Sequence, residues 1–108
     1  MEKKMAEVWE VWKLDGYEKT TDVEVRARLK EFVSDLRAAT GAQIKVMSGW
    51  YGEDNAYVII VQHASHEDFG KVAAKLYADK NWEAQTAERQ KNPKMQWKSG
   101  GTWVGEDL

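Results

Sequence analysis

A β-hairpin is predicted by residues 44–64, which read IKVMSGWYGEDNAYVIIVQHA. Two runs rich in β-branched and aromatic residues, Ile44–Tyr51 and Ala56–His63, flank a polar break at residues 52–55 that has the composition of a turn. We expect a strand and a helix before this hairpin, and helices and a strand after it. The hairpin therefore joins two similar halves of the chain.

The half before the hairpin carries a strand and a helix. Residues Ala6–Leu14 hold bulky apolar side chains on both parities, and a strand of this kind needs cover on both faces. The helix begins with Thr21 or Asp22 as its N-cap and stops at Gly41. Its apolar stripe recurs at helical spacing and consists of Val25, Leu29, Phe32, Val33 and Leu36.

The half after the hairpin repeats this plan with one addition. Ser65 is the expected N-cap of a helix that ends near residues 79–81. A further helical segment, Trp82–Lys91, precedes the last strand, Met95–Val104. The glycine pair 100–101 inside that strand predicts a bulge or bend.

The order of elements predicts the α+β fold class. Strand, helix, strand, strand, helix with an extra short helix, and strand is the ferredoxin-like βαββαβ plan. Residues 1–108 then form one domain, in which a four-stranded antiparallel sheet carries helices on one face only. The first and third strands are central, so the other face would expose Trp, Tyr, Ile and Val side chains. A second copy is the simplest cover, which predicts a homodimer through the sheet face.

Composition excludes several classes of function. The 108 residues carry 31% charged side chains and a net charge of -2, without the basic excess that nucleic-acid binding needs. The absence of cysteine excludes disulfides, thiolate nucleophiles and cysteine metal sites. No apolar segment approaches the roughly 20 residues that cross a bilayer, so we expect no membrane span and a cytoplasmic location. The six tryptophans must dominate the core, an interface or a pocket.

Residues 65–90, SHEDFGKVAAKLYADKNWEAQTAERQ, resemble the second helical region of the dimeric α/β-barrel superfamily. The likeness lies in Ser65 before an acidic helix start, Phe69 four residues on, and the sequence Ala78-Asp79-x-x-Trp82, although Lys80 stands where many members have proline. Element order extends the likeness over nearly the whole chain. Within that superfamily the chain resembles the antibiotic-biosynthesis-monooxygenase-like and NIPSNAP-like proteins, without a specific member being identified.

The resemblance implies a dimer of facing sheets and a small-molecule pocket between the sheet and the helices of each subunit. Members include cofactor-free quinone-forming monooxygenases, haem-degrading monooxygenases, polyketide cyclases, lactone isomerases and proteins without a known activity, so the family indicates the site and not the reaction. Haem-degrading members use a histidine further along the second helix, and residues 71–77 contain none. We therefore expect no cofactor.

Three residues are candidates for acid–base catalysis. His63 and His66 are the side chains whose ordinary pKa lies near neutrality, and His63 ends the third strand while His66 lies in the first helical turn. The alternative for both residues is a surface or strand-end histidine without a catalytic role. Glu10 is the charged residue flanked by apolar neighbours in the first strand. If its parity faces a pocket it can act as a base, and otherwise it pairs with a lysine or arginine.

An aromatic pocket is the candidate ligand site. Its expected lining is Trp9, Trp12, Trp50, Tyr57, Trp82 and Trp97, with Tyr51 and Trp103 nearby. Plain packing on a two-faced sheet would give the same aromatic alternation. Two histidines three residues apart make a weak metal-ligand set, so no metal is expected. The resulting prediction is a small-molecule-binding protein that acts as a cofactor-free monooxygenase or a polyketide-cyclase-like enzyme. The alternative is a non-catalytic ligand-binding or structural dimer with no pocket chemistry.

Overall fold

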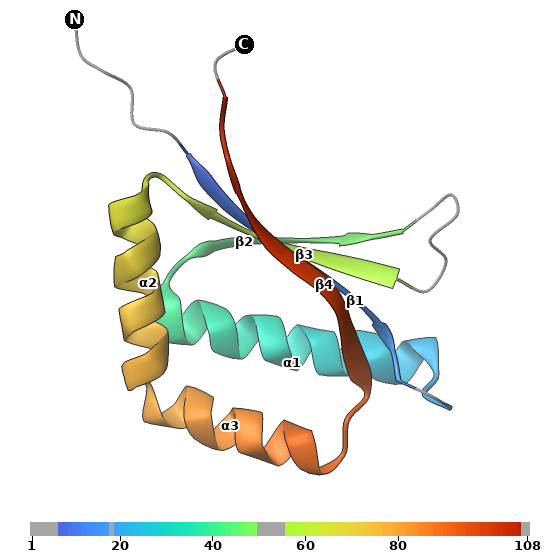
Figure 1. Ribbon diagram of the computed structural model, residues 1–108. Helices are drawn as coiled ribbons and strands as arrows, with labels where there is room; N and C mark the ends of the chain where they lie inside the picture. The colour runs from blue at the N-terminus through green and yellow to red at the C-terminus, as the bar shows by residue number, and fades with distance from the viewer. Residues whose placement is uncertain (1–6, 18, 50–55, 107–108) are drawn as a thin grey trace, which may run out of the picture.

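The computed structural model describes residues 7–17, 19–49 and 56–106. The predicted hairpin turn at residues 52–55 lies outside these residues. Within the described part, four strands and three helices follow one another in the predicted order (Figure 1). Their bounds are β1 Val8–Gly16, α1 Asp22–Thr40, β2 Gln43–Ser48, β3 Ala56–His63, α2 His66–Ala78, α3 Lys80–Lys91 and β4 Met95–Val104.

The sheet has the strand order β2-β3-β1-β4, and each neighbouring pair is antiparallel. All three helices lie on one side of it (Figure 1). The predicted ferredoxin-like α+β fold is therefore confirmed. As expected, β1 and β3 are the central pair, and Val8 of β1 lies opposite His63 of β3 while Glu10 lies opposite Val61.

Helix α1 packs its apolar stripe on the sheet and has the predicted caps. The Thr21 hydroxyl oxygen accepts a hydrogen bond from the Glu24 backbone N–H at 3.2 Å. Gly41 ends the helix in the left-handed region with φ of 69°, which glycine adopts without strain. Residues of α1 and of the strands β1, β2 and β3 form one buried core, which contains Leu14, Val25, Leu29, Val33, Ile44, Tyr57, Ile59 and Val61.

Helices α2 and α3 are joined by a single residue, Asp79. Ser65 caps α2 as predicted, since its hydroxyl oxygen accepts from the Asp68 N–H at 3.2 Å. Asp79 ends α2 and caps α3, where its carboxylate accepts from the Trp82 N–H at 2.8 Å. Neither helix contains a fully buried residue. The pair therefore covers the sheet loosely compared with α1.

The strand β4 contains one bulge, and it is not at the predicted glycine pair. The register with β1 shifts between Lys13 and Leu14, so that Lys98 has no opposite residue. Gly100 and Gly101 continue the ladder in register. Gly100 lies opposite Trp12, and a Cβ atom there would lie 2.2 Å from Cε3 of the Trp12 ring. Close approach of an indole ring, and not a bulge, thus accounts for this glycine.

The sheet has a second face, away from the helices. Side chains alternate between the two faces of a strand, and Val8 and Leu14 of β1 are fully buried on the helix side. The odd-numbered residues of β1 and their cross-strand partners therefore lie on the other side, which we call the open face. Its apolar members are Trp9, Val11, Met47, Val58, Ile60 and Trp103.

No helix in residues 7–17, 19–49 and 56–106 is both long enough and apolar enough to cross a membrane.

Candidate functional site

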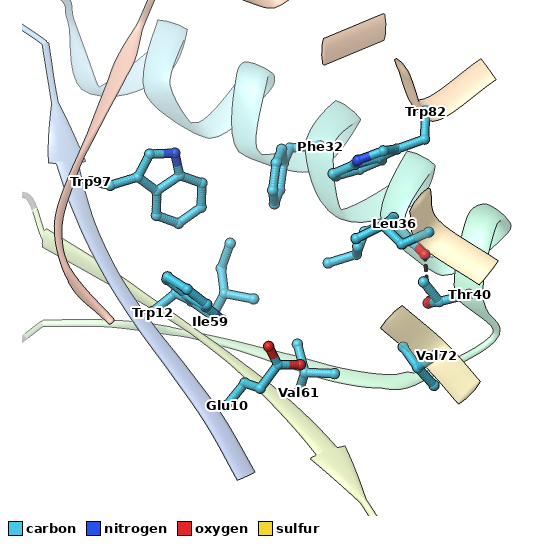
Figure 2. Close-up of a pocket in the computed structure, with 11 residues that line it drawn as sticks. Glu10, Trp12, Phe32, Leu36, Thr40, Ile59, Val61, Val72, Trp82 and Trp97 are labelled. Atoms are coloured by element: carbon cyan, nitrogen blue, oxygen red, sulfur yellow. Dashed lines mark hydrogen bonds between the residues drawn. The ribbon is translucent and has the colours of Figure 1, made fainter. Parts of the chain in front are cut away.

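A cavity of about 300 Å³ lies between the sheet and the three helices, and we call it the central cavity. Its volume is at the lower end of the range of small-molecule sites, and its lining is almost wholly apolar, as in such sites. Figure 2 shows the residues around it. The lining consists of Glu10, Trp12, Phe32, Leu36, Thr40, Ile59, Val61, Val72, Leu76, Trp82 and Trp97.

Four aromatic side chains from four different elements form a continuous row along the cavity, which we call the aromatic wall. Trp12 of β1 meets Trp97 of β4 edge to face, with ring centres 6.3 Å apart. Phe32 of α1 lies 5.3 Å from Trp97 and 5.2 Å from Trp82 of α3. Edge-to-face pairs of this kind are favourable because the positive ring edge meets the negative ring face. The rings therefore hold one another in place around the cavity.

Glu10 is the one ionisable side chain among the described residues that line the cavity. It shares the helix-side parity of β1 with Val8, Trp12 and Leu14, and its carboxylate points into the space below the aromatic wall (Figure 2). Its side chain is 20% exposed. An ionisable group in an apolar cavity of this kind is a candidate functional group.

The Glu10 carboxylate is hydrogen-bonded to His63 of the neighbouring strand β3. The distance from Nε2 of His63 to Oε2 of Glu10 is 2.8 Å, and the histidine side chain is only 1% exposed. The two residues are diagonal neighbours on the same face of the β1–β3 pair. Phe69 of α2 meets the imidazole ring edge to face at 5.1 Å. An ionised carboxylate only accepts hydrogen bonds, so with Glu10 in that form the Nε2–H of His63 is the donor of this bond.

A second polar group of the lining, the Thr40 hydroxyl, already has hydrogen-bond partners within α1 and the residues after it. It donates to the backbone carbonyl of Leu36 at 2.7 Å and accepts from the Ala42 N–H at 3.1 Å. This arrangement ends α1, and it leaves the Glu10 carboxylate and the indole N–H groups of the lining tryptophans as the other polar groups of the cavity.

Four of the candidate residues predicted from the sequence line the central cavity, and a fifth is hydrogen-bonded to one of these lining residues. Glu10, Trp12, Trp82 and Trp97 are lining residues, and His63 is the hydrogen-bond partner of Glu10. The sequence left the facing of Glu10 open, and the structure turns it toward the helices.

The remaining candidates lie elsewhere. Trp9 is on the open face, opposite Trp103 and Gln62, so it does not line this cavity. His66 is exposed at the start of α2 and is not part of the lining. Trp50 lies outside the described residues.

Tyr57 faces the helices but belongs to a different hollow. It lines a groove between α1 and β2 together with basic side chains such as Arg26. Its hydroxyl donates to the Asp22 carboxylate at 2.5 Å. Burial, and then the hydrogen bond to Asp22, raise the pKa of the Tyr57 hydroxyl, while the same bond and the Arg26 guanidinium lower the pKa of Asp22. Tyr57 therefore ties β3 to the first turn of α1.

Several lining residues were not predicted as site residues. Phe32 and Leu36 belong to the predicted apolar stripe of the first helix, and Val72 and Leu76 lie in the helix predicted after Ser65. Periodicity shows that a helical residue faces inward, but it does not show whether that residue meets another side chain or a cavity. Nothing in the sequence indicates that Thr40 lines a cavity, because a threonine at a helix end is usually interpreted as part of the helix terminus.

In the part of the chain that the structure describes, no group of three or more His, Cys, Asp or Glu side chains could hold a metal ion.

Comparison with known proteins supports the fold assignment. No family model matches the sequence, and no curated protein matches it either. SnoaB, a cofactor-independent oxygenase from Streptomyces nogalater, superposes with a TM-score of 0.64 at 14% identity, covering 94% of this chain and 95% of SnoaB.

Two further structures extend the likeness. A NIPSNAP family protein of unknown function from Agrobacterium tumefaciens has a TM-score of 0.66 at 13% identity, covering 96% of this chain and 89% of that one. A NIPSNAP-like domain protein from Burkholderia xenovorans has a TM-score of 0.66 at 14% identity, covering 98% and 88%. The resemblance to the superfamily is thus confirmed at the level of the fold.

Proposed function

We propose that the protein binds a small, mainly apolar aromatic molecule in the central cavity and that Glu10 accepts a proton from it. One observation carries this proposal. The carboxylate lies at an apolar, tryptophan-lined cavity and is hydrogen-bonded to the buried His63. Carboxylates that work as general bases lie in such surroundings, where little water competes for them.

His63 acts as a positioning residue in this proposal. Its Nε2–H occupies Oε2 of Glu10, so Oε1 is the oxygen that meets a ligand. The buried imidazole fixes the orientation of the carboxylate before any ligand arrives. Because the carboxylate is oriented in advance, little of its conformational entropy has to be lost when it accepts the proton.

Cofactor-free oxygenation is the reaction class that we propose first, because SnoaB, a structure with the same fold, is a cofactor-independent oxygenase. A suitable probe is anthrone, a tricyclic carbon acid. Glu10 removes a proton from the carbon opposite the carbonyl, the carbanion transfers one electron to dioxygen, and the two radicals combine to a peroxide anion, which takes the proton back from Glu10. The resulting hydroperoxide loses water, so one anthrone and one dioxygen give one anthraquinone and one water. A cyclase reaction would use the same base on an enolisable ligand.

The experiment measures dioxygen uptake and anthraquinone formation with anthrone. The Glu10→Gln variant keeps the size of the side chain and removes the base, so we expect a rate at least about 100-fold lower than that of the wild type. Glu67→Gln is the matched control, because Glu67 is an exposed residue of α2 that pairs with Lys71 outside the cavity. Equal rates in the wild type and in Glu10→Gln would contradict the role of Glu10.

Binding is tested separately by quenching of tryptophan fluorescence by anthrone. The Val72→Phe variant fills the cavity and should abolish quenching, whereas Val23→Phe places the same group at a residue that is 77% exposed and should not. Binding without turnover would favour the non-catalytic alternative. Failure of anthrone and other fused-ring probes to bind would remove the support for a ligand site.

We further propose that the protein is a homodimer whose subunits meet through the open face. The support is the apolar stripe of Val11, Val58 and Ile60 on the two central strands, which no helix covers. Trp103 and Met47 extend the stripe on both sides and are 65% and 51% exposed. Contiguous apolar surface of this kind marks an interaction site in soluble proteins.

A further inference from the structure

The charge of the central cavity is one-sided. Glu10 supplies the one formal charge among its described lining residues, and that charge is negative whenever the carboxylate is ionised. His63, the hydrogen-bond partner of Glu10, is not a lining residue, so the charged group that faces the cavity is the carboxylate. An anionic ligand would therefore be repelled, and a cationic one attracted.

The aromatic wall has the same preference. Aromatic rings carry negative charge on their faces, and tryptophan attracts cations most strongly. The neighbouring rings of the wall are steeply inclined to one another, with interplanar angles of 77° for Trp12 and Trp97 and 63° for Phe32 and Trp82. Inclined rings surround a space from several sides, and in Figure 2 they lie around the region into which Glu10 points.

The cationic side chain of Arg89 contacts the aromatic wall from outside the cavity. The Arg89 guanidinium lies 5.4 Å from the ring centre of Phe32 and 5.5 Å from that of Trp82, and Arg89 is not a lining residue. Its charge is balanced by the Asp35 carboxylate, whose oxygen lies 2.6 Å from Nη1 of Arg89. The inner side of the wall is therefore left for another cation.

We infer that the ligand of the central cavity is a hydrophobic organic cation, such as a protonated arylalkylamine or an aryl quaternary ammonium compound, whose charged nitrogen lies between Glu10 and the aromatic wall. This inference rests on the proposed function, since it names the class of molecule that the cavity takes. It adds a sign of charge that an apolar cavity alone would not specify.

The test compares two ligands of the same shape and different charge. The probes are 4-(trimethylammonio)benzyl alcohol and 4-tert-butylbenzyl alcohol, in which a carbon replaces the charged nitrogen. Dissociation constants are measured by tryptophan fluorescence and by calorimetry. We expect the wild type to bind the cation at least about tenfold more tightly, which is the scale of a desolvated cation–π contact. A quaternary nitrogen has no proton to lose, so this experiment is independent of proton transfer.

The Glu10→Gln variant assigns the preference. It should weaken binding of the cation and leave binding of the neutral probe unchanged, while Glu67→Gln should change neither. Equal affinity of the wild type for both probes, or tighter binding of the neutral one, would overturn the inference and leave the proposed cavity site intact. An equal loss for both probes in Glu10→Gln would also overturn it, because Glu10 would then act through the shape of the site. Failure of both probes to bind would overturn the inference and the proposed site together.

Discussion

Among the described glycines, Gly100 is the one at which an added Cβ would lie closest to other atoms. The Gly100→Ala variant would place Cβ 2.2 Å and 2.3 Å from two atoms of the Trp12 ring, which must then move away from its edge contact with Trp97. We expect a loss of about 1–3 kcal/mol in the free energy of unfolding, the usual cost of overpacking. Urea denaturation followed by tryptophan fluorescence measures it.

The matched control for this prediction is the next residue. In Gly101→Ala the nearest atom would be Nε1 of Trp103 at 3.6 Å, an ordinary contact. Both variants change the entropy of the unfolded chain alike, so their difference isolates the clash with Trp12. Equal stabilities of the two variants would show that Trp12 is free to shift, and that the aromatic wall is less rigid than its contacts imply.

The hydrogen bond between Tyr57 and Asp22 predicts a pH dependence of stability. Because the folded pKa of Asp22 is lowered, first by Tyr57 and then by Arg26, its contribution is present above the ordinary carboxyl pKa and is lost as the pH falls through the lowered value. The folded pKa of Tyr57 is raised, so its contribution holds below about pH 10 and is lost at higher pH.

We therefore expect Tyr57→Phe to lower the melting temperature most between about pH 5 and pH 9, with the difference narrowing at both extremes. Thermal melts followed by circular dichroism over this range measure it. Tyr17→Phe is the control, because Tyr17 is 45% exposed and should show no such profile. A deficit in Tyr57→Phe that stays constant from acid to alkali would mean that the hydroxyl contributes only through packing.

Helix α3 depends on one residue for its start, since the Asp79 carboxylate caps it and no residue of α3 is fully buried. Asp79→Ala should cost about 1 kcal/mol, the typical value of a lost N-cap. The loss should be local, with faster hydrogen exchange of backbone amides in residues 80–91, because no residue of this helix is fully buried. Trp82 would loosen with it, so binding in the central cavity should weaken.

Asp79→Ser retains a capping oxygen and serves as the control. Hydrogen exchange measured by mass spectrometry distinguishes the two variants. Uniform protection of α3 in Asp79→Ala would show that the ring contacts of Trp82 with Phe32, and not the cap, keep the helix in place.

At the same scale, the elements show which features a sequence reveals. Ser65 and Gly41 were predicted correctly because a cap depends on neighbours within one helical turn. The facing of Glu10 was not predictable, because β1 carries apolar side chains on both parities and its orientation depends on strands that are distant in sequence. The cavity itself depends on how far α2 and α3 stand from the sheet. No local pattern encodes that distance.

In the whole molecule, the strand β1 serves two surfaces at once. Glu10 and Trp12 project toward the central cavity, while Trp9 and Val11 project to the open face. The strand β1 carries apolar side chains on both of its faces, and this is explained if both faces of the sheet are covered. The helices cover one face, and the proposed partner subunit covers the other.

The homodimer is therefore the prediction that belongs to the whole molecule. Light scattering coupled to gel filtration should give twice the 12.4 kDa of one chain at micromolar concentration. Ile60→Lys places a charge in the middle of the open face, where burial against a partner would be costly, and should give a monomer. Val23→Lys is the control, because Val23 of α1 is 77% exposed on the helix side, and it should remain dimeric. A wild-type protein that stays monomeric would show that the open face tolerates water, and the apolar character of β1 would then lack the explanation given above.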